Sequence, residues 1–317
     1  MWLLAYFRQI YQGKVDVTEA AGVTVIPLTQ EKVLAESLHL AWSRDGRVWT
    51  ALNDNRPVWP NPPTAFRVRD PFVARGPADG FFHLVATGGD KKRGCLYARS
   101  RDLLDWEPPR SLPVMESVPQ VRNVWAPEWV WDPEQRNYFV FWSSSSGEHG
   151  WDESRIWCAR TADWETWTPP RVLFDPGYTV IDATITRHEG TFYLFFKDER
   201  FGHKHGGEFR FIKVATAPVL DGPYTVATEA VTPSITEGPA VFRPNGDYGP
   251  WLLLCDHCMD NRYGAFASED LLRWQPVGDA VFPPEARHGS VFAVTEDEFP
   301  ALVQRLGSNG GEAEVRP

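Results

Sequence analysis

The sequence predicts an all-β fold, a five-bladed β-propeller, from three observations. Short apolar, strand-like runs recur along the 317 residues, and five of them carry an ionisable residue at the start. A second signal, a polar turn that ends in an aromatic residue, recurs out of phase with the first. The composition is 14% aromatic with 25 Gly and 27 Pro, which is typical of many short strands joined by tight turns.

The five ionisable residues are evenly spaced. Successive separations are 58, 54, 55 and 51 residues, and the residues are Asp70, Glu128, Asp182, Glu237 and His288. Repeats of roughly 40 to 50 residues with four strands each are typical of propeller blades, and this period is slightly longer. We therefore interpret the chain as five copies of one unit.

The aromatic turns indicate how the ring closes. Four of the five runs are followed by such a turn, but the run at His288 is not, and the turn that ends at Trp49 has no ionisable run before it. We expect the N-terminal strands, up to Trp49, to join the C-terminal blade that begins at His288. Closure of this kind removes the free edges of the sheets.

We expect a single domain over residues 1–306, with a short helix at 296–306, and a flexible tail at 307–317. Two β-sandwich domains are the alternative, and they would need a linker near the middle of the chain. The Ser/Gly-rich candidate for that linker, 143–150, falls inside a repeat.

Charge and hydropathy restrict the partners. The formal net charge is -10 and no Lys/Arg run is present, which argues against a nucleic-acid partner. The apolar N-terminus has no basic region before it and is too short for a signal peptide, and no stretch approaches the length of a membrane span. We expect a cytoplasmic protein with no membrane partner.

The predicted topology brings the ionisable residues together. The first strand of each blade lines the central channel of a propeller, so the five side chains would converge on one small volume. Several carboxylates so close cannot all ionise at their normal pKa, and burial raises at least one of them. A raised acid beside an ionised base is the arrangement that glycoside hydrolysis requires.

The ordered set of motifs resembles glycoside hydrolase family 43, five-bladed propellers that act on arabinose- and xylose-containing glycans. The motifs are Arg69-Asp70-Pro71, Trp125-Ala126-Pro127-Glu128, Ile181-Asp182, Glu237-Gly238-Pro239 and Arg287-His288-Gly289-Ser290. The resemblance implies an inverting hydrolase of the α-L-arabinofuranosidase or β-xylosidase type. Such an enzyme would release terminal arabinofuranosyl, xylosyl or galactofuranosyl residues from an oligosaccharide substrate.

The same resemblance implies a role for each residue. Asp70 would be the general base, Glu237 the general acid, and Asp182 the carboxylate that modulates the pKa of the acid. Inversion needs the base and acid carboxyls about 6.5 to 9.5 Å apart, with room for a water. No cofactor is required, although the resemblance implies an ordered water or a structural calcium ion beside His288.

Substrate-binding candidates flank the catalytic set. Trp125 is the predicted platform for a sugar ring, Phe72 is a second aromatic candidate, and Glu128 is a wall residue of the pocket or the partner of an arginine. The charged run 197–200 follows a predicted strand. We interpret it as a solvated charge run, with lining of the pocket mouth as the alternative.

Two other functions remain open. One is a related five-bladed fructan hydrolase or a glycoside phosphorylase, although the acid candidate is followed by Gly238 here and by Cys in the fructan enzymes. The other is a carbohydrate-binding propeller without catalysis. Lectin-like propellers bind between blades and do not need two Asp and one Glu at the axis, which favours an enzyme.

Overall fold

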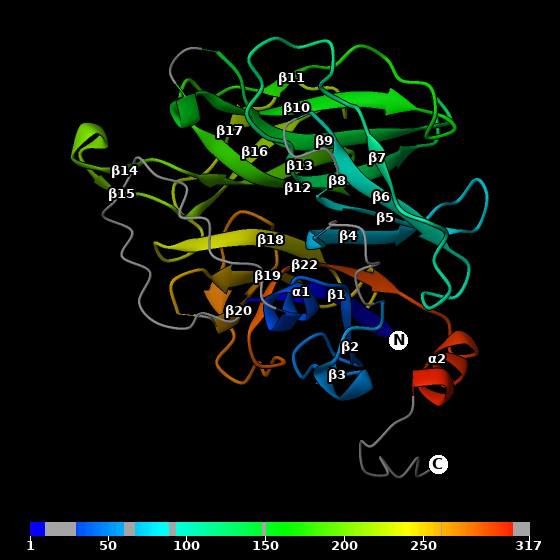
Figure 1. Cartoon of the computed structure of the whole chain (residues 1–317). Helices are drawn as coiled ribbons and strands as arrows, with labels where there is room; N and C mark the ends of the chain where they lie inside the picture. The colour runs from blue at the N-terminus through cyan, green and yellow to red at the C-terminus, as the bar shows by residue number, and fades with distance from the viewer. Residues whose placement is uncertain (10–29, 60–66, 89–92, 148–149, 261, 307–317) are drawn as a thin grey trace.

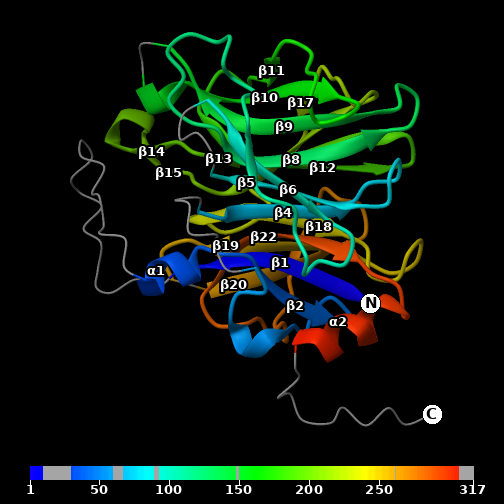
Figure 2. The ribbon, with the colours of Figure 1, turned by 45° about the vertical axis from the view of Figure 1, so that its right-hand side comes forward.

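The computed structural model describes residues 1–9, 30–59, 67–88, 93–147, 150–260 and 262–306 (Figure 1). Five four-stranded antiparallel sheets form the blades of a propeller, as the sequence predicts. The two views in Figures 1 and 2 show the sheets stacked around the region where β4, β18 and β22 lie. The predicted tail, 307–317, lies outside the described residues.

Each blade runs outward from its innermost strand. Blade 1 consists of β4 (Arg69–Arg75), β5 (Phe82–Thr87), β6 (Cys95–Ser100) and β7 (Arg110–Leu112). Blade 2 consists of β8 (Trp125–Asp132), β9 (Asn137–Ser145), β10 (Ser154–Thr161) and β11 (Arg171–Phe174). Blade 3 consists of β12 (Val180–His188), β13 (Thr191–Asp198), β16 (Ile212–Ala217) and β17 (Thr225–Val226).

The remaining elements complete the ring and decorate it. Blade 4 consists of β18 (Thr236–Phe242), β19 (Trp251–His257), β20 (Arg262–Ser268) and β21 (Gln275–Pro276). Blade 5 consists of β22 (Ala286–Ala293), β1 (Trp2–Arg8), β2 (His39–Ser43) and β3 (Thr50–Ala51). Outside the blades lie α1 (Gln30–Ala35), η1 (Asn53–Asn55), η2 (Gly150–Glu153), β14 (Phe201–Gly202), η3 (His203–His205), β15 (Gly207–Glu208) and α2 (Glu298–Leu306).

The predicted closure of the ring is confirmed. β1 pairs with β22 on one side and β2 on the other, with Leu4 opposite Val291 and Ala41 (Figure 1). Backbone hydrogen bonds between Met1 and Val294 run in both directions at the end of this pair. Since the two ends of the chain share one sheet, no blade is left with an unpaired inner strand.

The hydrophobic core consists of five clusters, one at each seam between neighbouring blades. The recurring turns supply large side chains to these clusters. In three of the turns an Asp carboxylate caps backbone N–H groups and the indole Nε1 donates to a carbonyl three residues back, as Trp106 does to Leu103. Each turn therefore presents its aromatic ring to the seam, where Trp274, for example, meets Phe195 edge-on.

The innermost strands carry β-bulges at the level of the predicted site. Four bulge residues with positive φ follow one another at intervals of 56 residues, and they are Asp70 (φ 49), Ala126 (φ 44), Asp182 (φ 53) and Gly238 (φ 63). The structural repeat is therefore more regular than the spacing of ionisable residues suggested. It also corrects the alignment, because Ala126 and not Glu128 is the counterpart of Asp70 and Asp182.

A belt of hydrogen bonds crosses all five seams at this level. In each seam an N–H of one innermost strand donates to a side-chain oxygen of the preceding blade. The pairs are Ala126 to Thr87 (2.8 Å), Asp182 to Ser143 (2.9 Å), Gly238 to Asp182 (3.3 Å), His288 to Asp256 (2.8 Å) and Val73 to Ser290 (2.8 Å). At four of these positions a bulge takes the N–H out of the ladder within its own sheet, and the belt satisfies it from the neighbouring blade; Val73 lies beyond the bulge of β4.

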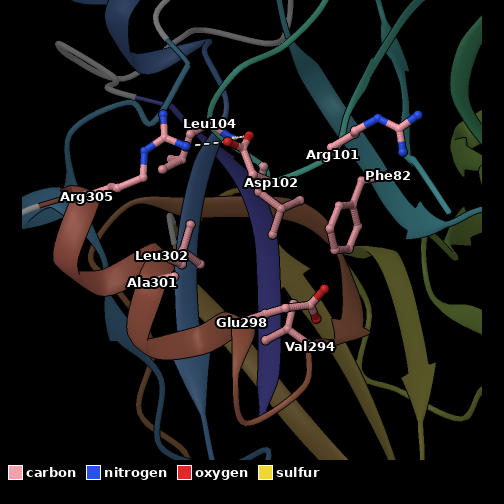
Figure 3. A pocket seen from close by; sticks show the side chains of 10 residues that line it. Phe82, Arg101, Asp102, Leu104, Val294, Glu298, Ala301, Leu302 and Arg305 are labelled. Atoms are coloured by element: carbon pink, nitrogen blue, oxygen red, sulfur yellow. Dashed lines mark hydrogen bonds and ion pairs between the residues drawn. The ribbon is translucent and has the colours of Figure 1, made fainter.

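The C-terminal helix α2, within the predicted 296–306, fastens the seam between blades 5 and 1. Arg305 pairs with Asp102, and the buried Leu302 joins the hydrophobic cluster of that seam (Figure 3). Arg305 also pairs with Asp105, and Glu298 pairs with Arg75. A hollow of about 130 Å³ remains between α2 and the 101–104 turn. None of the predicted site residues lines it, and no described helix is long and apolar enough to cross a membrane.

We expect Ser290→Ala to lower the free energy of unfolding by about 1 to 3 kcal/mol, because it leaves the buried N–H of Val73 without its acceptor. Urea unfolding of this variant beside Ser117→Ala, an exposed site, measures the effect. A Ser290→Ala protein as stable as the Ser117→Ala control would contradict a stabilising role for the belt.

Candidate active site

The structure brings the five predicted ionisable residues to the innermost strands, and they differ in exposure. Asp70 and Glu237 reach solvent, with side chains 15% and 21% exposed. Asp182 and His288 are both 8% exposed, and Glu128 is buried. The two carboxylates open to a substrate are thus those of blades 1 and 4.

Asp70 lies in β4 at the first bulge. Its Oδ2 accepts a hydrogen bond from Thr87 Oγ1 at 2.5 Å, and its Oδ1 lies 3.4 Å from His288 Nδ1. Burial alone would raise the pKa of Asp70, but His288, Arg69 and Thr87 together hold this pKa below its usual range. Asp70 is therefore ionised at neutral pH, the state that a general base needs.

Asp182 occupies the equivalent bulge of β12 and has the opposite character. Its Oδ2 accepts the Gly238 N–H and lies 3.6 Å from His288 Nδ1. Burial, together with the neighbouring charges of Glu237 and Asp70, raises the pKa of Asp182 to about 7 against the opposing effects of His288 and Lys197. Near neutral pH this carboxyl holds a proton for much of the time.

Glu237, one residue before the bulge of β18, lies between two cations. Lys197 Nζ donates to its Oε2 at 2.8 Å, and Arg287 Nη2 donates to its Oε1 at 2.6 Å. Burial would raise the pKa of Glu237, but Lys197 and Arg287 hold it far below its usual range. In this structure the predicted general acid is therefore ionised.

Glu128 lies two residues beyond the bulge of β8. It is hydrogen-bonded to Thr184, and no salt bridge to it is present among the described residues, so the predicted arginine partner is not found there. Burial raises the pKa of Glu128 to about 8. The side chain is a neutral acid at pH 7, away from solvent.

His288 lies between the carboxylates of Asp70 and Asp182. Burial lowers the pKa of the imidazole, but Asp182 and Asp70 raise it more, to about 10. The ring is therefore an imidazolium, which would repel a cation. Within the described ranges no group of three His, Cys, Asp or Glu side chains is arranged to hold a metal ion.

The aromatic candidates fall in different places. Trp125 is 36% exposed at the start of β8 and stacks on Trp151 of η2, with ring centroids 4.9 Å apart and planes 11° apart. This pair presents an indole surface beside the channel. Phe72 instead packs edge-on against Trp129 in the cluster between blades 1 and 2, which argues against a role in substrate binding.

Three charged residues around Glu237, which are Lys197, Arg287 and Asp256, were not predicted as site residues. Lys197 belongs to β13 and is buried, so the interpretation of 197–200 as a solvated run is wrong for it. Arg287 Nε lies 3.0 Å from Asp256 Oδ2, and Asp256 is fully buried. An ionisable residue at the end of a long apolar strand, as in 192–197 and 251–256, is the signal that would have found Lys197 and Asp256.

Comparison with known families identifies the family of the chain. The profile of a family described as a probable glycosyl hydrolase domain, related to family 43, matches residues 25–300, which is most of the chain. The chain therefore belongs to this glycosyl hydrolase family, and the fold and family expected from the motifs are confirmed.

A curated α-L-arabinofuranosidase of Bifidobacterium longum subsp. longum is 25% identical over 242 residues, covering 62% of this chain and 22% of that protein. The chain thus spans about a fifth of the length of that relative. Two solved structures share the fold. An α-L-arabinofuranosidase from Lactobacillus brevis has a TM-score of 0.55 at 19% identity, covering 74% of this chain and 82% of that one.

The second structure is a xylan β-1,4-xylosidase from Bacillus halodurans. Its TM-score is 0.56 at 17% identity, and the match covers 74% of this chain and 48% of that one. At this level of identity both structures support the fold and not a particular substrate.

The protonation of Glu128 predicts a pH-dependent stability difference. The folded pKa is raised above the unfolded one, so the stabilising contribution is present below about pH 4 and is lost as pH rises to about 8. Glu128→Gln keeps the neutral form. We therefore expect the stability of this variant relative to wild type to increase from pH 5 to pH 8.

Urea unfolding at several pH values measures this difference, with a slope of up to about 1.4 kcal/mol per pH unit. Glu116→Gln, at an exposed site, is the control. A difference that stays constant between pH 5 and pH 8 would show that Glu128 is ionised in the folded protein.

Proposed function

We propose that the protein is an inverting glycoside hydrolase that releases terminal arabinofuranosyl or xylosyl residues from oligosaccharides. Asp70 acts as the general base, Glu237 as the general acid, and Asp182 modulates the acid. Water deprotonated by Asp70 attacks the anomeric carbon from one face of the sugar. The bond to the leaving oxygen breaks on the other face, and that oxygen takes a proton from Glu237.

One observation carries the proposal. Of the four carboxylates predicted for the site, Asp70 and Glu237 are the two most exposed, and they stand on strands of blades that are not neighbours. A sugar above the channel would have one carboxylate on each side. The buried Asp182 lies between them in chain order, with its pKa raised to about 7 by burial.

The proton of the acid needs a source. Lys197 and Arg287 keep Glu237 ionised in the structure, while Asp182 is partly protonated near pH 7. Substrate binding excludes water, which favours the neutral form of a carboxyl. Glu237 then takes up a proton from solvent or from Asp182 before it protonates the leaving oxygen.

The type of sugar is proposed from the proteins to which this chain is similar. The curated relative is named an α-L-arabinofuranosidase, and the structures that share the fold include an α-L-arabinofuranosidase and a β-xylosidase. Arabinofuranosides and xylopyranosides are therefore the first substrates to examine. Galactofuranosides belong in the same panel because pocket loops decide which ring fits.

We expect Asp70→Asn and Glu237→Gln each to lower kcat/KM by about two to four orders of magnitude on whichever aryl glycoside the wild type cleaves, because each removes positioned proton transfer. A panel of aryl furanosides and pyranosides measures this, with exposed Glu134→Gln as the matched control. Wild-type rates in either variant would contradict its role.

The panel also separates the other functions. Cleavage that requires inorganic phosphate would indicate a phosphorylase. Sugars that raise Tm while no glycoside is cleaved would favour a carbohydrate-binding propeller.

We expect Trp125→Ala to raise KM about two- to tenfold with little change in Tm, because the exposed indole stacks on a sugar ring and is not part of a seam cluster. Steady-state kinetics on an oligosaccharide and thermal melting measure the two quantities. An unchanged KM would place the substrate elsewhere.

A further inference from the structure

We propose that Lys197 is a positioning residue whose ammonium, shared between Glu237 and Glu199, sets how readily Glu237 takes up the proton that a general acid must deliver. The inference rests on the proposed function for its catalytic consequence. The ion pairs themselves can be tested without activity.

The position of Lys197 in the repeat is unusual. It lies opposite Ile181, as Thr87 lies opposite Arg69 and Ser143 lies opposite Trp125. In blade 4 the equivalent residue is Asp256, opposite Glu237. Lys197 in blade 3 thus occupies the same position of the second strand as Thr87, Ser143 and Asp256 do in blades 1, 2 and 4.

In the other three blades this position serves the seam. Thr87, Ser143 and Asp256 each accept an N–H from the next innermost strand. In blade 3 Asp182 accepts that N–H, from Gly238, so position 197 is released from this task. A cation stands there instead and reaches across the seam to Glu237.

Lys197 lies between two carboxylates. Its Nζ donates to Glu237 Oε2 at 2.8 Å and forms an ion pair with Glu199 Oε2 at 2.7 Å. The lysine side chain is 3% exposed, while those of Glu199 and Glu237 are 26% and 21% exposed. A buried lysine does not leave for solvent, so the two carboxylates compete for one ammonium.

Other charges around Glu237 have fixed partners. Arg287, from β22, donates to Glu237 and lies against Asp256 of β19. Among the described residues, Asp182 of β12, His288 of β22 and the thiol of Cys258 also face Glu237 or Lys197. Arg210, which pairs with Glu208, lies near Glu199. Lys197 is the cation of this set whose second partner, Glu199, stands at the solvent edge.

Replacing Lys197 and neutralising Glu199 should shift the pKa of Glu237 in opposite directions. Removing the ammonium leaves Glu237 with Arg287 alone, so its pKa rises and the proton is held to higher pH. Neutralising Glu199 leaves the ammonium to Glu237 alone, so its pKa falls further. A side chain that only filled space would not give a pair of shifts with opposite sign.

The test compares Lys197→Met, Lys197→Arg and Glu199→Gln with Lys213→Met. Lys213 is a buried lysine of the same blade whose ion pairs are with Asp198 and Glu229. In protein labelled with 13C-glutamate, the carboxyl resonance of Glu237 is assigned by its loss in Glu237→Gln and is titrated with pH. This readout needs no substrate.

We expect the Glu237 titration midpoint to move up by about one to three pH units in Lys197→Met. We expect it to move down in Glu199→Gln and to stay near wild type in Lys197→Arg and Lys213→Met. The limb of the kcat/KM profile that reports Glu237 should move in the same directions.

The outcomes separate the two claims. Unmoved midpoints in Lys197→Met and Glu199→Gln, or shifts of equal size in Lys213→Met, would overturn the inference. Midpoints that move while the kcat/KM limbs do not would leave the shared ammonium standing and remove Glu237 from the role of general acid. If Lys197→Met does not fold, Lys197→Gln takes its place, with the same upward shift expected and an unmoved midpoint overturning the inference.

Discussion

The belt of hydrogen bonds that crosses the five seams is the constraint on which the site depends. Each bulge withdraws a buried N–H from its own sheet, and burial without a partner would cost about 1 to 3 kcal/mol. The preceding blade supplies the acceptor for the bulge N–H groups of Ala126, Asp182, Gly238 and His288, and also for Val73, which lies beyond the bulge of β4. Because Asp182 is both an acceptor of this belt and a carboxylate of the candidate site, the register of the blades fixes the position of that site.

The four carboxyl groups of the candidate site differ in their protonation. Asp70 and Glu237 are held ionised by cations close to them, while burial leaves Asp182 and Glu128 with raised pKa values. His288 is charged because it lies between two carboxylates. The channel thus holds both an ionised carboxylate, Asp70, and carboxyls that keep a proton near neutral pH, Asp182 and Glu128. Acid-base hydrolysis of a glycoside requires such a combination.

Much of the fold could be predicted from the sequence because each blade repeats its apolar runs and its aromatic turn, and because the unmatched ends, Trp49 and His288, complete one sheet. The alignment of blade 2 failed, since chemistry at Glu128 was a stronger signal than backbone geometry at Ala126. The end of the apolar strand 192–197 marks Lys197 as unusual, but the sequence does not reveal its contact across a seam with Glu237, 40 residues later in the chain.

The stereochemistry of hydrolysis tests the central claim most directly. Proton NMR during the first turnovers of an aryl glycoside that the enzyme cleaves shows which anomer appears before mutarotation. We expect a product with inverted configuration, because in the proposed mechanism Asp70 activates water and forms no bond to the sugar. A product with retained configuration would contradict it, since retention requires a carboxylate nucleophile and a covalent intermediate.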